Sequence, residues 1–283
     1  MPDKIKTSPR PITASVVKEM EDRARAVRRS IIKMIAKAGS GHPGGSLSIS
    51  DILTSLYFTR LNHRPKEPRW RDRDRVVLSK GHSVPALYAV LAECGYFPKS
   101  ALLRLRKMGS ILQGHPDMTR TPGVEASTGS LGQGISIAVG MALAGKLDSK
   151  GYRIYAILGD GELEEGEVWE AAMAAAHYKL DDLCAIIDFN GLQIDGRIQD
   201  VMNPEPIPEK WRAFGWEVKE IDGHDFSQII RAFDWAAGVK GKPSAIVAHT
   251  IKGRGISFME SKANWHGVAP SSEEARQALM ELG

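Results

Sequence analysis

Residues 153–196 read RIYAILGDGELEEGEVWEAAMAAAHYKLDDLCAIIDFNGLQIDG, a stretch in which apolar runs alternate with glycine-containing turns. An apolar run over 154–158 breaks at Gly159-Asp160-Gly161, and a helical pattern then covers 168–178. A second apolar run, 183–188, precedes an Asn-Gly turn. Strand, turn, helix, strand and turn in this order are typical of a parallel α/β unit, because two parallel strands need a crossover between them. The stretch therefore predicts a parallel sheet.

The two turns of this unit carry oxygen-bearing side chains, Asp160 after the first strand and Asn190 after the second. One crossover would place both at the carboxyl edge of the sheet, where open α/β folds bind ligands. Carboxylate, amide and backbone carbonyl oxygens are the ligands that Mg²⁺ prefers, with substrate phosphates completing its shell. Glycines beside Asp160 would let a diphosphate approach the backbone and the following helix N-terminus. The pair therefore predicts a site for Mg²⁺ and a diphosphate.

The rest of the chain continues the alternation of helices and strands. Helices are expected over 16–38, from 50, up to 94, over 100–107, 134–147, 168–178 and 226–238, and from 271. Strands are expected over 75–78, 154–158, 183–188, 216–221 and 245–250, and the glycine-rich stretch 39–48 is expected to be a loop. This order predicts an α/β fold, a mostly parallel twisted sheet with helices on both faces. No linker divides it, so 1–283 is expected to be a single domain with a flexible extension over 1–13.

Composition excludes several classes of protein. The 283 residues are 42% hydrophobic and 25% charged, with mean hydropathy −0.24 and formal net charge +4. No apolar run is long enough to span a membrane, and residues 1–11 lack the apolar core of a secretory signal. Arginines over 69–75 alternate with aspartates, which favours a solvated loop over a nucleic-acid patch. Cys94 and Cys184 lack metal-type spacing, so reduced thiols in a cytoplasmic protein are expected.

Histidines gather beside glycines in the expected loops. Five of the eight do so: His42, His82, His115, His224 and His266. Loop histidines at strand ends are plausible polar contacts to an anionic ligand, although each can equally satisfy a turn carbonyl. From the residues alone both interpretations stay open. No spacing places two histidines on one helical face, as a zinc site would require.

Several short motifs occur in the order found in one enzyme family. They are Ser-Gly-His-Pro-Gly-Gly (40–45), Ser-Lys-Gly-His (79–82), Gly-His-Pro (114–116), Thr-Gly-Ser-Leu-Gly-Gln-Gly (128–134), Gly-Asp-Gly (159–161) with Glu165, Asp-Phe-Asn-Gly-Leu-Gln-Ile-Asp-Gly (188–196) and His-Gly (266–267). As a set they resemble transketolase, a thiamine-diphosphate-dependent enzyme, and they span nearly the whole chain.

The resemblance implies a set of site residues. Asp160, Asn190 and the carbonyl of Leu192 would hold Mg²⁺. The implied cofactor-binding residues are His82, Gly129, Ser130, Leu131, Gly161, Glu165, Asn190, Ile194 and His266. The implied catalytic residues are His42, His115 and His266, which would face the sugar, polarise its oxygens and relay protons. Two departures from the family pattern are Ser130, where proline is common, and Phe189, where a polar residue is common.

The resemblance also implies a partner. In this family a following domain, which the other protomer supplies, places a glutamate on the aminopyrimidine ring and so drives removal of the thiazolium proton. This chain ends at Gly283, just past His266, and therefore looks like the N-terminal subunit of a split transketolase. Its expected partner is the C-terminal subunit, which holds the pyrimidine-binding and C-terminal domains. A dimer in contact through 134–147 and 168–176 would give a heterotetramer.

The expected activity is transfer of a two-carbon ketol unit from a ketose phosphate to an aldose phosphate. One alternative is a fragment of a 1-deoxyxylulose-5-phosphate synthase-like enzyme. Ser-Lys-Gly-His-Ser (79–83) followed by Pro-Ala-Leu-Tyr (85–88) favours transketolase. A second alternative is a catalytically silent cofactor-binding or regulatory module, which the intact metal ligands and loop histidines disfavour.

Overall fold

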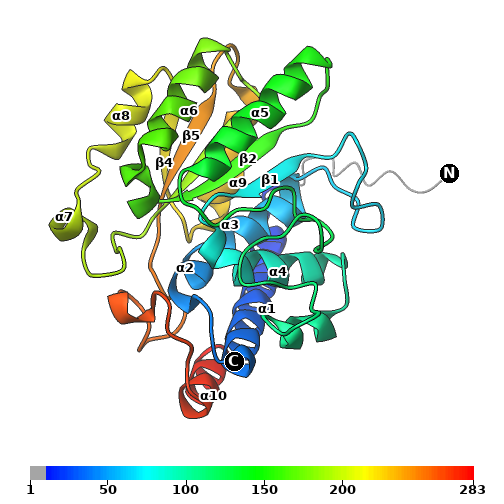
Figure 1. The fold of residues 1–283 in the computed structure, drawn as a ribbon, viewed down its shortest axis with the longest axis vertical. Coiled ribbons are helices and arrows are strands. Elements are labelled where there is room, and N and C mark those ends of the chain that lie inside the picture. Colours follow the sequence, from blue (N-terminus) through cyan, green and yellow to red (C-terminus); the bar gives the residue numbers. More distant parts are fainter. Residues whose placement is uncertain (1–10) are drawn as a thin grey trace.

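The computed structural model describes residues 11–283, and their strands form one five-stranded sheet (Figure 1). The strands are β1 (Arg75–Leu78), β2 (Ile154–Gly159), β3 (Leu183–Phe189), β4 (Glu217–Asp222) and β5 (Ser244–His249). Their order is β1-β2-β3-β5-β4, and every neighbouring pair is parallel. The predicted parallel α/β sheet is confirmed. Residues 1–10 of the extension predicted for 1–13 lie outside the described residues.

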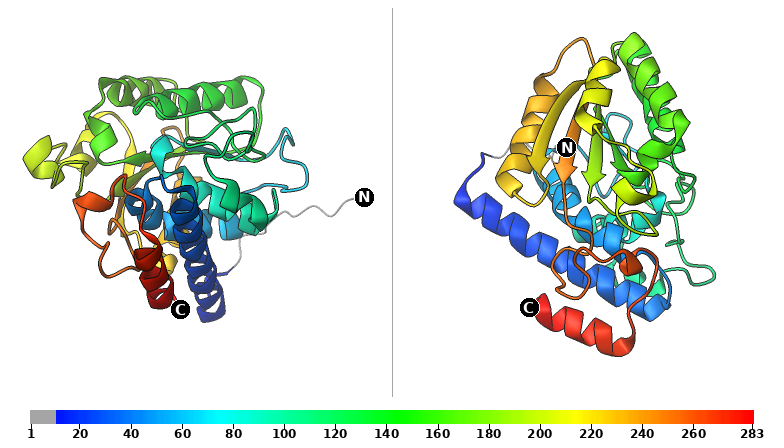
Figure 2. Two further views of the ribbon diagram at one scale, coloured as in Figure 1. Left: turned by 60° about the horizontal axis from the view of Figure 1, so that its bottom comes forward. Right: turned by 90° about the vertical axis from the view of Figure 1, so that its left-hand side faces the viewer.

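Helices cover both faces of this sheet (Figure 2). One face packs against α1 (Ala14–Ala38), α3 (Ser50–Ser55), α4 (Val84–Cys94) and α9 (Phe226–Gly238). The other face packs against α5 (Gln133–Leu147), α6 (Gly166–His177) and α8 (Ile207–Ala213). Side chains alternate along β2: Tyr155 and Ile157 join the first core, whereas Ala156 and Leu158 join the second. Burial on both faces explains why the strands read as continuous apolar runs.

Three further helices are α2 (Pro43–Ser48), α7 (Ile198–Val201) and α10 (Ser272–Glu281). Capping residues mark the ends of two helices. The Thr13 hydroxyl accepts a hydrogen bond from the Val16 amide at the start of α1, and Gly39 ends that helix in the left-handed conformation, with φ 69°. Ser271 and Glu274 form a reciprocal capping box at the start of α10.

The sequence prediction was wrong in two places. Residues 43–48, predicted as loop, form α2, in which Pro43 begins the helix and Gly44 and Gly45 are buried. A Cβ on Gly45 would lie 2.7 Å from Ser83 Oγ, so close packing overrides the poor helix propensity of glycine here. Residues 100–107, predicted as a helix, form only a 3₁₀ turn, Lys99–Arg104.

Two further predictions from the sequence concern membrane-spanning segments and the two cysteines. Among residues 11–283 no helix has both the length and the apolarity needed to cross a bilayer. Cys184 is buried in β3 and Cys94 is half-buried at the end of α4, and neither forms a disulfide.

Candidate active site

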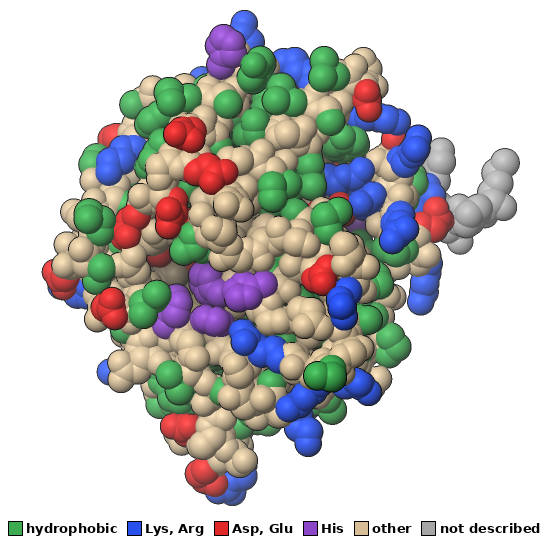
Figure 3. All heavy atoms as spheres, in the orientation of Figure 1, with side chains coloured by type: hydrophobic (Ala, Val, Ile, Leu, Met, Phe, Trp, Pro, Cys, Tyr) green, Lys and Arg blue, Asp and Glu red, His purple; other side chains and the backbone are tan. Residues whose placement is uncertain are grey.

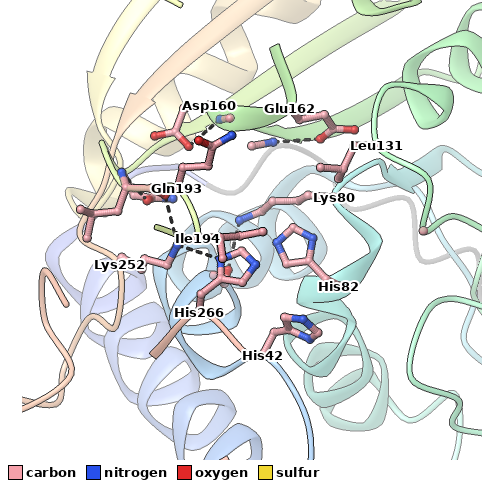
Figure 4. A pocket seen from close by; sticks show the side chains of 16 residues that line it. His42, Lys80, His82, Leu131, Asp160, Glu162, Gln193, Ile194, Lys252 and His266 are labelled. Atoms are coloured by element: carbon pink, nitrogen blue, oxygen red, sulfur yellow. Dashed lines mark hydrogen bonds between the residues drawn. The ribbon is translucent and has the colours of Figure 1, made fainter. Parts of the chain in front are cut away.

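A pocket opens at the carboxyl edge of the sheet, where loops from β1, β2, β3 and β5 meet (Figure 4). Its lining comprises His42, Gly45, Lys80, His82, Gly129, Leu131, Gly159, Asp160, Gly161, Glu162, Asn190, Leu192, Gln193, Ile194, Lys252 and His266. Histidine side chains gather in a hollow of the surface there (Figure 3). The structure thus brings together every predicted site residue except His115, Ser130 and Glu165.

The turns after β2 and β3 are joined through Asp160. Its carboxylate accepts hydrogen bonds from the amides of Gly161 (2.9 Å) and Gly191 (2.6 Å), which lie in the two different turns. Asn190 donates through Nδ2 to Asp188 (3.0 Å), and its Oδ1 accepts from the Leu192 amide (3.2 Å). One crossover therefore places the predicted metal ligands side by side, as the sequence suggests.

The residues present fit a bound divalent cation. Asp160 is only 3% exposed, and no ion pair to it occurs within residues 11–283. Burial and the neighbouring Asp188 charge raise the pKa of Asp160 to about 6, so its charge is poorly compensated. Gln193 Oε1 is buried beside it in the pocket and accepts no hydrogen bond from the described residues. A hydrated Mg²⁺ would compensate the negative charge of Asp160. One of its bound waters would donate a hydrogen bond to Gln193 Oε1.

A buried ion pair forms the floor of the pocket. Lys80 Nζ lies 2.5 Å from Asp188 Oδ2 and 3.1 Å from the Gly45 carbonyl. Asp188 also accepts hydrogen bonds from the hydroxyls of Ser48 and Thr250. Burial opposes the charge on Asp188, but Lys80 and these hydrogen bonds hold the pKa of Asp188 below its usual value. The charge of Lys80 is therefore already compensated within the protein.

Lys252 is the cation that faces the pocket without a carboxylate partner among the described residues. Its side chain is 3% exposed, and its ammonium donates to the Leu192 carbonyl (3.1 Å) and to His266 Nδ1 (3.0 Å). Burial lowers its pKa to about 8, which leaves it mostly charged at pH 7. An ammonium can only donate, so Nδ1 of His266 accepts and the ring proton lies on Nε2.

Three imidazoles form a close group above this floor. Ring centroids are 5.3 Å apart for His42 and His82, 5.1 Å for His82 and His266, and 5.5 Å for His42 and His266. Burial and neighbouring positive groups lower the pKa of His42 and His266 to about 4 and that of His82 to about 2. All three rings are therefore neutral at pH 7 and can both donate and accept hydrogen bonds.

The other predicted residues lie outside this lining. His115 is exposed, with its ring 6.5 Å from that of His42 and against Gly129. Ser130 and Glu165 are also exposed, and Glu165 lies against Gly132. Since these residues flank the pocket mouth, they can meet a ligand only at its outer end. His224, one of the five loop histidines, does not line the pocket: its ring hydrogen-bonds to Asp51, which lies outside the lining as well.

Glu162 connects three loops beneath the pocket. It accepts from the amides of Gly132 and Gly159, both at 3.0 Å, and from the Ser79 hydroxyl. Glu162→Gln would turn one acceptor into a donor facing an amide. We expect a loss of about 1–3 kcal/mol in the free energy of unfolding, the cost of unsatisfied buried groups. Thermal denaturation checks this, with the exposed Glu164→Gln as the control; equal melting temperatures for both variants would contradict it.

Sequence reasoning missed Lys80, Glu162, Gln193 and Lys252 as pocket residues, and Asp188 as the buried partner of Lys80. A signal existed for the two lysines, because each follows the carboxyl end of a strand, β1 for Lys80 and β5 for Lys252. That position alone predicts proximity to the ligand edge of a parallel sheet. Nothing local distinguishes the paired lysine from the unpaired one.

Comparison with known proteins identifies the family of the chain. A family model described as transketolase, thiamine diphosphate binding domain, matches residues 20–283. A 6-deoxy-6-sulfo-D-fructose transketolase subunit of Clostridium sp. (strain MSTE9) is 48% identical over 93% of this chain and 96% of its own. An apulose-4-phosphate transketolase subunit of Phocaeicola vulgatus is 43% identical over 94% of both chains.

Single-chain transketolases match along part of their length. Human transketolase is 42% identical over 93% of this chain, which spans 42% of the human protein. The solved structure of Campylobacter jejuni transketolase superimposes with a TM-score of 0.88 at 34% identity, over 96% of this chain and 43% of that one. The family model covers nearly all of the described residues. The chain therefore belongs to the transketolase family and corresponds to the N-terminal, thiamine-diphosphate-binding domain of its members.

Proposed function

We propose that this chain is the N-terminal subunit of a two-chain transketolase, a single domain that binds Mg²⁺ and thiamine diphosphate. The assembled enzyme transfers a two-carbon ketol unit from a ketose phosphate to an aldose phosphate. The observation that carries the proposal is the convergence in one pocket of a buried uncompensated carboxylate, an unpaired ammonium and three neutral imidazoles.

Each residue of the site has a role suited to its chemistry. Asp160, Asn190 and the Leu192 carbonyl would hold the metal, while Gly161, His82 and Lys252 would bind the diphosphate. Gly129, Ser130, Leu131 and Glu165 would contact the aminopyrimidine ring, and Ile194, 62% exposed, would offer an apolar surface to the thiazolium ring. Thiamine diphosphate, when bound, supplies the nucleophilic carbon that takes up the two-carbon unit.

The histidines hold and move protons on the sugar. His266 presents Nε2–H because Lys252 occupies its other nitrogen, so it donates a hydrogen bond to a carbonyl or hydroxyl oxygen. His42 Nδ1 is buried without a hydrogen-bond partner among the described residues. Neutral rings of low pKa are weak bases, which suits hydrogen bonding to sugar oxygens; an anionic ligand beside them would raise these pKa values toward the working pH that proton relay requires. His115 reaches the sugar from the pocket mouth.

The division into two chains rests on the lengths of the relatives. The chain covers 94–96% of two relatives that are named as transketolase subunits, but only 42% of the human single-chain enzyme. Those subunits are named for 6-deoxy-6-sulfo-D-fructose and apulose-4-phosphate, so ketoses with an anionic end are the substrate class that we propose. The C-terminal subunit would supply the pyrimidine-binding domain and its glutamate.

The purified chain alone is expected to be inactive and self-associated. The glutamate that activates the aminopyrimidine is expected from the partner chain. Helices α5 and α6 expose apolar side chains: Ile137 (37%), Leu147 (83%) and Met173 (55%). Since α5 and α6 pack against each other, their exposed apolar side chains offer a candidate interface for a second copy. A dimer of this chain flanked by two partner chains is the expected heterotetramer.

A coupled ketol-transfer assay, with and without the C-terminal subunit, tests this proposal, and light scattering gives the size of the isolated chain. Turnover should require both chains, and the isolated chain should have the mass of a dimer. Rapid turnover by this chain alone would refute the two-chain proposal. A stable monomer would refute the α5–α6 interface. An inactive mixture with intact cofactor binding would support the silent module instead.

A further inference from the structure

A chain of buried polar groups lies outside the pocket lining and borders a separate hollow. It links Arg28 on α1, Asp51 on α3 and His224 in the turn after β4. Arg28 Nη2 lies 2.6 Å and His224 Nδ1 2.7 Å from the same oxygen, Asp51 Oδ2. The side chains of all three are at most 10% exposed. Burial alone would raise the pKa of Asp51, but Arg28 and the hydrogen bonds hold it below its usual value.

The hydrogen bonds fix which nitrogen of His224 carries the proton. The Ile251 amide donates to His224 Nε2 at 2.8 Å, so that nitrogen is an acceptor. The ring proton therefore lies on Nδ1 and is donated to the ionised Asp51. His224 thus ties a buried carboxylate to the backbone one residue before Lys252.

Close packing holds the histidine in this place. Gly223 donates through its amide to the His249 carbonyl (2.8 Å), and a Cβ on Gly223 would lie 2.4 Å from Thr250 Cγ2. The turn that carries His224 is therefore pressed against the segment leaving β5. Lys252 in turn packs against Gly44, where an added Cβ would lie 3.0 Å from Lys252 Cγ. A small movement of the Ile251 backbone would displace the ammonium.

We propose that His224, oriented by Asp51, is a positioning residue for Lys252. It fixes the Ile251 amide and so holds the Lys252 ammonium against the Leu192 carbonyl and His266, at the end of the pocket assigned to the diphosphate. The consequence for cofactor binding rests on the proposed function, whereas the backbone constraint does not.

Amide hydrogen exchange in the cofactor-free chain tests the constraint directly. In His224→Leu the Ile251 amide should exchange on the order of tenfold faster, because its acceptor is lost, while amides in β2 and β3 keep their rates. The matched control is His249→Leu, since His249 ends β5 and bonds to the exposed Glu220 rather than to the backbone of this segment. His224→Gln, which keeps an acceptor, should restore part of the protection. Unchanged Ile251 exchange, or equal acceleration throughout the core, would overturn the proposal.

A double-mutant cycle on cofactor affinity separates positioning from a purely structural role. Calorimetry with thiamine diphosphate and Mg²⁺ should show affinity falling about fivefold to tenfold in His224→Leu. In a Lys252→Met background His224→Leu should lower the cofactor affinity by less than about twofold, because the ammonium that His224 positions is already absent. Additive effects would overturn the proposal. If the unaltered chain with its partner binds no cofactor, the proposed function fails, and the exchange experiment still decides the role of His224.

Discussion

Asp160→Ala should abolish Mg²⁺-dependent binding of thiamine diphosphate by the assembled enzyme. Asp160 is the charged member of the proposed ligand set, and its carboxylate bridges the turns after β2 and β3. Losing one charge from a buried, compensated pair costs about 3–5 kcal/mol, which corresponds to a loss of affinity of at least about a hundredfold. Asn190→Ala removes a neutral ligand and should weaken binding less.

Calorimetric titration of the reconstituted complex measures this effect. Asp200→Ala, on the exposed surface of α7, serves as the control and should bind normally. Unchanged affinity in Asp160→Ala would rule out the metal site.

The affinity of the same site for the metal should depend on pH. Because burial and Asp188 raise the pKa of Asp160 to about 6, protons compete with the metal below that value. Protonation of Asp160 should therefore lower the metal affinity by about fourfold between pH 7.5 and 5.5.

Replacing the pocket histidines should have a large effect on turnover and a small one on stability. His42→Ala and His266→Ala should each lower kcat on the order of 10²- to 10⁴-fold, the usual range for lost proton transfer. His115→Ala, at the mouth, should cost less. The rings face a cavity, so the melting temperatures should stay close to that of the unaltered protein.

Steady-state kinetics with the partner chain present, together with thermal denaturation, checks this prediction. His249→Ala is the control, because His249 lies at the same sheet edge but bonds only to Glu220 among the described side chains. A structural histidine would give the opposite pattern. A loss of about 1–3 kcal/mol in stability with normal kcat would show that the residue merely satisfies turn carbonyls.

The sheet could be predicted because its signals are local. Apolar runs such as 183–188 are bounded by turn residues, and Thr13 and Gly39 mark the ends of α1 within the sequence itself. The side-by-side position of Asp160 and Asn190 follows from one crossover rule. Residues 43–48 were mispredicted because the cause of their helix is remote: Gly45 has to fit against Ser83.

The roles of Lys252 and His224 could not be predicted, for the same reason. Lys252 acquires its role only where the loop after β5 meets Leu192 and His266. In the sequence His224 resembles the other loop histidines. Its ring nevertheless hydrogen-bonds to Asp51, which is distant along the chain, and does not line the pocket. Such contacts join segments that share no periodicity, so no pattern within either segment reveals them.

A crystal structure of the chain with its partner, thiamine diphosphate and Mn²⁺ in place of Mg²⁺ would show the metal site itself. We predict an anomalous peak in the pocket, about 2.0–2.2 Å from the Asp160 carboxylate, the Asn190 amide oxygen and the Leu192 carbonyl. The diphosphate should lie between that metal and Lys252. An ordered cofactor whose metal has other ligands, or a pocket that stays empty at saturating cofactor, would contradict it.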